Sequence, residues 1–264
     1  MNELIKKFEK ILDKNTLFID KTKLDWDFYF YKETPKEVEN FTHDMAINDW
    51  LIERVRRFNH SASFLFDSIQ KVVNIQKYLA SKEESIAITE ILRGEIRNLC
   101  INLEIYFDKI VAFCRYYFFF DLKKTEKKDN FMKTLEQFEN IDPTIKIFST
   151  CCKEIYNNLD YKYIYSIRCD EVHNESALDL HNFRFTNKAP LEIVDLGYKI
   201  SNEIILSKIY TSIMLSIKLK NALQKILEVV KIPTIANYIK CNDNLKNVIM
   251  PKERCDYIMP VLKK

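Results

Sequence analysis

The sequence predicts an all-α protein, an up-and-down bundle of long antiparallel helices. The chain of 264 residues contains two glycines. Sheets, hairpins and phosphate-binding loops use glycine for turns with positive φ and for close backbone approach, so a β-rich fold is not expected, and the sequence contains no glycine-rich nucleotide loop. Apolar residues recur every three or four positions over long stretches, which is the period of an amphipathic helix. Most of the six prolines fall between these stretches, where helices begin.

The first half of the chain predicts three helices and one extended piece. Residues 2–14 form a short helix, and LDWDFYFYKE (24–33) alternates aromatic and charged residues as an extended segment does. A long helix is expected from about residue 35 to 79, and a second from about 85 to 122. The wide apolar stripe of the second helix predicts a central position in the bundle. The stripe consists of Ile88, Ile91, Ile96, Leu99, Leu103, Phe107, Ile110, Val111 and Cys114.

The second half begins with a charged break, KKTEKKDN, and a short helix over 131–138. The pair Asp142-Pro143 predicts an N-cap and a first helical residue, opening a helix that runs towards Val172. NESALDLHNFRFTNK (174–188) has little periodicity and is expected to be a loop. A third long helix follows Pro190 and reaches about residue 231.

These elements predict three parts of the chain. Residues 83–232 would form the central helical bundle, and residues 1–82 an N-terminal helical extension packed on it. Residues 233–264 would form a tail of short helices, since three further prolines interrupt the chain there.

Composition narrows the classes of function. The net charge of +3 is too small to demand a nucleic acid as partner. The seven cysteines form no CxxC pair, so neither a zinc ribbon nor a disulfide framework is expected, and several should be buried as small hydrophobes. The longest apolar run, IVAFCRYYFFF, is short and contains Arg115, and the N-terminus has no secretory apolar core. We therefore expect a cytoplasmic protein without a membrane span.

The residues whose side chains are best suited to catalysis lie in YSIRCDEVHNES, where Arg168 and His173 are five positions apart. Such a spacing is about 140° around a helix, so the two side chains could reach one cleft if the helix ends near Val172. Histidine titrates near neutrality and can move the protons that RNA cleavage requires. A guanidinium can hold two phosphate oxygens and stabilise the charge of the transition state.

The segment Arg168-Cys-Asp-Glu-Val-His173 resembles the motif of the HEPN superfamily, an arginine followed after four to six residues by a histidine late in a helical bundle. The resemblance covers about residues 83–232. It implies a core of four or five helices and a dimer in which two motifs form a composite site. It also implies a metal-independent endoribonuclease of a toxin–antitoxin, anti-phage or RNA-processing system, with RNA as substrate and an antitoxin or other protein as a further partner. Other members of the superfamily bind nucleotides or partners without catalysis, and Cys169 here occupies a position that is commonly polar.

Further residues could support the pair. Asn174 could position the ribose or the phosphate, and Asp170 or Glu171 could orient the imidazole. On the central helix, Glu104 and Asp108 fall one turn apart, where polar residues of a HEPN-like bundle can support the motif.

Glu104, Asp108 and His173 also have simpler interpretations without a functional role. Glu104 and Asp108 could face water or pair with Arg97 or Lys109. His173 could be a surface or capping histidine.

A second copy of the loose spacing, from Arg54 to His60, is expected to sit mid-helix, where Arg54, Arg56 and Arg57 would form a solvated or RNA-facing basic patch. The later copy is preferred because it precedes a helix break.

Metal binding and base stacking are two other chemistries for which the sequence offers residues. Asp170 and His173 have the spacing of a di-metal helix, but no second Asp or Glu stands three residues before a histidine, so no metal or cofactor is expected. The aromatic run of residues 116–120 could stack on unpaired bases, although packing in the core or in a dimer interface is the expectation.

Overall fold

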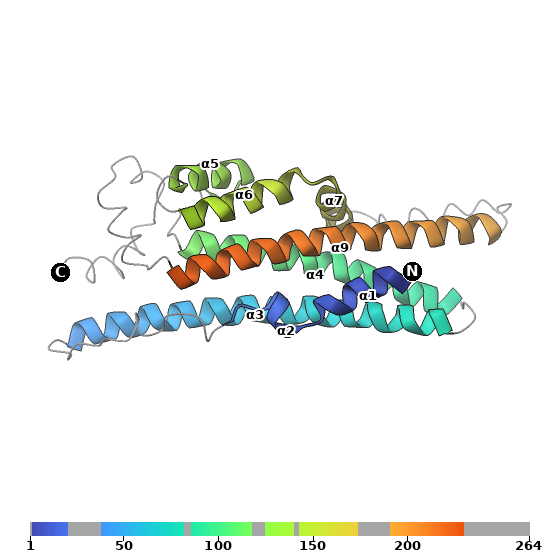
Figure 1. Cartoon of the computed structure of the whole chain (residues 1–264), viewed down its shortest axis with the longest axis horizontal. Coiled ribbons are helices and arrows are strands. Elements are labelled where there is room, and N and C mark those ends of the chain that lie inside the picture. Colours follow the sequence, from blue (N-terminus) through green and yellow to red (C-terminus); the bar gives the residue numbers. More distant parts are fainter. Residues whose placement is uncertain are drawn as a thin grey trace. The chain divides into compact units, whose positions relative to one another are not determined.

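The computed structural model describes residues 2–20, 38–81, 86–117, 125–139, 143–173 and 191–229. Within these ranges the chain forms eight helices and no strand (Figure 1). The predicted all-α fold is therefore confirmed. The extended piece expected at 24–33, the loop expected at 174–188 and the tail of 233–264 lie outside the described residues.

Three long helices dominate the described chain. These are α3 (Val38–Ser81), α4 (Ile86–Tyr117) and α9 (Leu191–Val229). Each follows an apolar period of three to four residues, and each ends within five residues of the predicted boundary. Within each compact unit defined below, α3 and α4 run in opposite directions (Figure 1).

Five shorter helices complete the described part. They are α1 (Asn2–Ile11), α2 (Lys14–Leu17), α5 (Lys128–Phe138), α6 (Pro143–Asn157) and α7 (Leu159–His173). Pro143 is the first residue of α6, as predicted from its fixed φ.

The single helix predicted from residue 143 to 172 is wrong, because the chain breaks at Asn158. The Asn158 side chain accepts a hydrogen bond of 2.9 Å from the backbone N–H of Tyr161, which is the geometry of an N-cap. Asn158 thereby ends α6 and starts α7. In Figure 1 α7 is seen nearly end-on, so within unit 1 it runs across the direction of the parts of α4 and α9 that belong to that unit.

The chain divides into two compact units, each made of three separated stretches. Unit 1 comprises Met1–Phe18, His60–Asp108 and Glu154–Lys218, and unit 2 comprises Ile19–Asn59, Lys109–Lys153 and Leu219–Lys264. The long helices α3, α4 and α9 pass from one unit into the other. The predicted division at residues 82 and 232 stays a prediction.

The core of unit 1 holds the N-terminal segment in place. The Tyr106 hydroxyl of α4 donates a hydrogen bond of 2.8 Å to the buried carbonyl of Leu17, and the Phe8 ring meets Tyr210 of α9 edge-on with centroids 5.6 Å apart. Four members of the apolar stripe predicted for α4 are buried in unit 1, namely Ile96, Leu99, Leu103 and Phe107, whereas Ile91 is 56% exposed. Cys100 and Tyr106, which the predicted stripe did not include, are buried as well.

Unit 2 contains most of the buried thiols. Cys114, Cys151 and Cys152 are buried free cysteines there, as Cys100 is in unit 1, so the prediction that cysteines serve as small core residues is confirmed at these positions. Of the aromatic run at 116–120, Tyr117 is 1% exposed and packs in the core. No described helix has the length and apolar character that a membrane span requires.

Candidate functional site: the α4–α7 cluster

The structure places the predicted motif in the last turns of α7. Arg168 is half-buried, and the helix ends at His173, next to the predicted end at Val172. The side chains of Asp170, Glu171 and His173, and the whole of Asn174, lie outside the described residues. Their predicted roles stay predictions.

The described residues around Arg168 form one group across two helices of unit 1. Glu104 comes from α4, and the other members come from successive turns of α7. We call this group, Glu104, Tyr161, Tyr165, Arg168 and Cys169, the α4–α7 cluster. Residues four and seven positions apart lie on one helix face, so Tyr161, Tyr165 and Arg168 share a stripe of α7.

Glu104 is the buried acid of the cluster. Its side chain is 2% exposed, and its Oε2 accepts a hydrogen bond of 2.9 Å from the Tyr161 hydroxyl. The other carboxyl oxygen, Oε1, is buried and has no hydrogen-bond partner among the described residues. The alternative that this side chain faces water is therefore wrong for Glu104, whereas Asp108, one turn later, is exposed.

Burial governs the charge of Glu104. Loss of water around the carboxyl raises the pKa of Glu104 from 4.5 to about 8; the bond from Tyr161 and the charge of Arg168 oppose the rise, and the charge of Asp108 adds to it. At neutral pH the carboxyl is therefore mostly protonated and uncharged.

Packing between aromatic rings holds Tyr161, whose hydroxyl donates the hydrogen bond to Glu104. The Phe107 ring lies 5.1 Å from the Tyr161 ring and 5.4 Å from the Tyr156 ring, measured between centroids. Tyr161 is 5% exposed, and burial followed by the proximity of Glu104 raises the pKa of its phenol, which keeps it a hydrogen-bond donor. Packing and hydrogen bonding thus attach the first turns of α7 to α4.

The first turn of α7 is also held to α9. Lys208 Nζ lies 2.7 Å from the Asp160 carboxylate and 5.2 Å from the centroid of the Tyr163 ring. Tyr163 therefore faces α9, while Tyr165, two positions later and about 200° around the helix, lies on the side of Arg168.

Sequence reasoning missed Tyr165, which lies three residues before Arg168. Its ring is 49% exposed. A hydrogen bond with the Cys169 thiol raises the pKa of Tyr165, and the positive charge of Arg168 acts in the opposite direction. The spacing of Tyr161, Tyr165 and Arg168 on one face was the signal that could have identified it.

The charge of Arg168 is not compensated by its described neighbours. No carboxylate among the described side chains lies within ion-pair distance of its guanidinium. The closest buried acid, Glu104, is mostly neutral at neutral pH. A half-exposed guanidinium in this state can bind an anion such as a phosphate diester.

The earlier copy of the motif has a different setting. His60 is exposed on α3, and its imidazole packs on the Phe64 ring with centroids 4.6 Å apart. Arg56 and Arg57 are exposed, as expected for a solvated basic patch, and Arg54 is half-buried.

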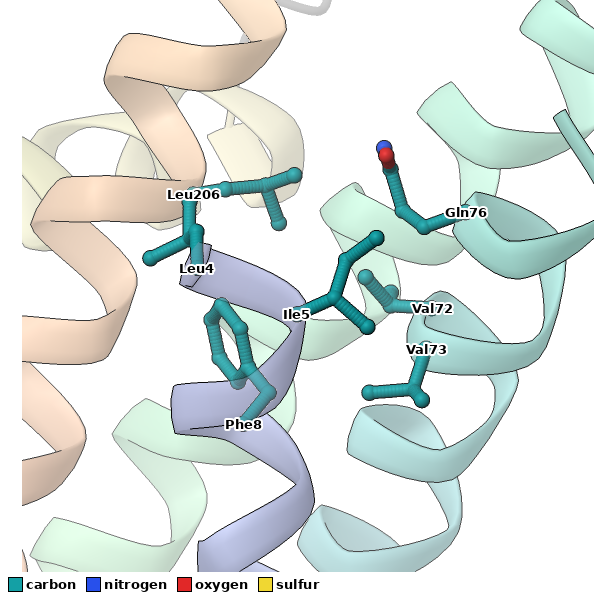
Figure 2. A pocket seen from close by; sticks show the side chains of 7 residues that line it. All are labelled: Leu4, Ile5, Phe8, Val72, Val73, Gln76 and Leu206. Carbon is teal, nitrogen blue, oxygen red and sulfur yellow. The ribbon is translucent and has the colours of Figure 1, made fainter. Parts of the chain in front are cut away.

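Two other kinds of site can be compared with the α4–α7 cluster. Among the side chains that the structure describes, no three His, Cys, Asp or Glu residues come close enough to hold a metal ion. A small pocket of unit 1 has a volume of about 10 Å³, room for about one water molecule, whereas ligand pockets usually measure about 300–1,000 Å³. Figure 2 shows its lining, in which Gln76 is the single polar side chain: Leu4, Ile5, Phe8, Val72, Val73, Gln76 and Leu206. This lining carries no group that could transfer a proton.

No protein-family model, curated protein or solved structure matches the chain. The case for a function therefore depends on the α4–α7 cluster and on the motif that it contains.

Proposed function

We propose that the protein is a metal-independent endoribonuclease of the HEPN type, in which Arg168 holds the scissile phosphate and His173 transfers protons. One observation carries the proposal. Arg168 is half-exposed near the end of α7, and the buried acid beside it is mostly uncharged at neutral pH, so none of the described carboxylates neutralises the guanidinium that would bind a phosphate.

The reaction needs two proton transfers and no metal ion. The ribose 2′-oxygen loses its proton and attacks the adjacent phosphorus, while the bond to the 5′-oxygen of the next nucleotide breaks and that oxygen gains a proton. The products are a 2′,3′-cyclic phosphate and a free 5′-hydroxyl. His173 would serve as base or acid, with Asp170 or Glu171 orienting its imidazole and Asn174 positioning the ribose or phosphate.

The proposal includes a dimer of two copies of the chain. Two His173 side chains, one from each protomer, would divide the roles of base and acid at a composite site. A toxin, anti-phage or RNA-processing role, with an antitoxin or other protein as partner, belongs to the same proposal.

The test is cleavage of a mixed RNA pool by the purified full chain in excess EDTA. Wild type should produce 2′,3′-cyclic phosphate ends, and Arg168→Ala and His173→Ala should each abolish them. His60→Ala is the matched control, because it removes an exposed histidine from α3 and should retain activity. Cleavage that survives both motif substitutions would refute the proposed site.

The alternative function is a non-catalytic helical module that binds RNA, a nucleotide or a protein. One observation favours it. Cys169 follows Arg168 where the motif commonly carries a polar residue, and it is a half-buried free cysteine. Tight binding of RNA by a folded wild-type protein that leaves the strand intact would select this alternative.

A further inference from the structure

Tyr165 differs from Tyr161, the other aromatic residue of the α4–α7 cluster, in facing water. Its side chain is 49% exposed, whereas Tyr161, one turn earlier on the same face, is 5% exposed. An isolated exposed tyrosine needs no explanation, but this one has a defined neighbour. Arg168 follows three residues later, which on a helix is about 4.5 Å along the axis and about 60° around it.

The backbone of α7 holds the Tyr165 ring in place at its Cβ. A tyrosine side chain has only two torsions that set the position of its ring, so it loses little conformational entropy when a planar group packs on it. The exposed ring and the exposed part of the guanidinium therefore form one surface, aromatic on one side and cationic on the other.

We propose that Tyr165 stacks on an unpaired base next to the phosphate that Arg168 holds, so that single-stranded RNA is the substrate class. The inference rests on the proposed function, because it takes the phosphate at Arg168 as given. It adds the residue that selects the structure of the RNA.

Two physical arguments select a single strand over a duplex. In a duplex both faces of each base are covered by neighbouring bases, so a side chain on the surface of a helix has no free face to stack on. The proposed attack also requires the 2′-oxygen, the phosphorus and the leaving 5′-oxygen to lie in line, which a flexible unpaired nucleotide reaches and a regular duplex does not.

The experiment measures binding separately from cleavage. The probe is a short unstructured 2′-O-methyl oligonucleotide, which lacks the attacking hydroxyl, and its duplex with a complementary 2′-O-methyl strand is the second probe. Affinities of the full chain are measured by fluorescence anisotropy for wild type, Tyr165→Leu and Tyr165→Phe. Tyr163→Leu is the matched control, because Tyr163 lies on the same helix but packs against Lys208.

Tyr165→Leu should weaken binding of the single strand by about tenfold, within the range found for base–aromatic stacking. Tyr165→Phe should retain the affinity, since the ring remains, and Tyr163→Leu should match wild type. Binding of the duplex should change little in any variant.

Three results would overturn the inference. They are an unchanged single-strand affinity of Tyr165→Leu, an equal loss in Tyr163→Leu, and a wild type that does not bind the single strand. Failure of the proposed function looks different: wild type would not cleave unmodified RNA, while the loss of single-strand affinity in Tyr165→Leu would remain.

Discussion

Glu104→Gln isolates the effect of one buried ionisable group. Glutamine has nearly the same shape as a protonated glutamate, and its carbonyl oxygen can accept the hydrogen bond that the Tyr161 hydroxyl donates. The substitution therefore removes the titration of residue 104 while leaving its packing in place. Because burial raises the pKa of Glu104 to about 8, the two proteins should differ in how their stability depends on pH.

The size of the difference follows from the two pKa values. Unfolding returns the carboxyl to water, where its pKa is 4.5, so the unfolded chain releases a proton that the folded chain keeps. The contribution of Glu104 to the free energy of unfolding is fully present below pH 4.5 and is lost as the pH rises through about 8. With each pKa unit worth about 1.4 kcal/mol, the total loss is about 5 kcal/mol, of which about 3 kcal/mol is lost by pH 7.

Urea unfolding from about pH 5 to about pH 9 measures this loss. The free energy of unfolding of Glu104→Gln minus that of wild type should increase steadily with pH and level off above about pH 8. Glu3→Gln is the control, because it makes the same substitution at a side chain that is 85% exposed. A difference between Glu104→Gln and wild type that stays constant over this pH range would refute the claim that Glu104 is buried and protonated.

Three further substitutions test the packing around the cluster. Tyr161→Phe removes the hydrogen bond that opposes the effect of burial on Glu104, so the pKa of Glu104 should rise further above 8. A carbon-13 NMR titration of that carboxyl measures the rise. The free energy of unfolding should fall by about 1 kcal/mol because the hydrogen bond is lost. Asn158→Ala removes the cap of α7 and should lower the free energy of unfolding by about 1 kcal/mol, whereas Asn158→Asp, which keeps an acceptor, should lower it less. Phe107→Ala should cost about 3–5 kcal/mol in chemical unfolding, and Phe107→Leu clearly less; equal losses would show that the ring contacts contribute little.

The fold class was predictable because a single local property sets it. An apolar side chain every three or four residues predicts a helix wherever the pattern runs, and α3, α4 and α9 follow it for many turns. The break between α6 and α7 was not predictable from that property. Buried residues continue at intervals of three on both sides of Asn158, at Ile155, Tyr161 and Ile164. The break comes instead from a side-chain hydrogen bond, which the apolar pattern does not record.

The candidate site was predictable in part. The pattern of the motif identified Arg168, and the predicted helix end agrees with the end of α7 at His173. The burial of Glu104 was not predictable, since its partner, the Tyr161 hydroxyl, is 57 positions away in the sequence. A carboxylate between apolar neighbours fits either face of a helix until the packing of the second helix is known.

The interleaved composition of the two units bears on how the protein is made. Each unit contains three stretches, and in each unit stretches of the other separate them along the chain. The ribosome must therefore synthesise the chain to Lys218 before the last stretch of unit 1 exists, and by then two stretches of unit 2 have already emerged. Neither unit can be excised as one continuous fragment, so truncation and domain transplantation are unsuitable ways to assign activity to one of them. Point substitutions in the full chain are the appropriate genetic tool for this protein.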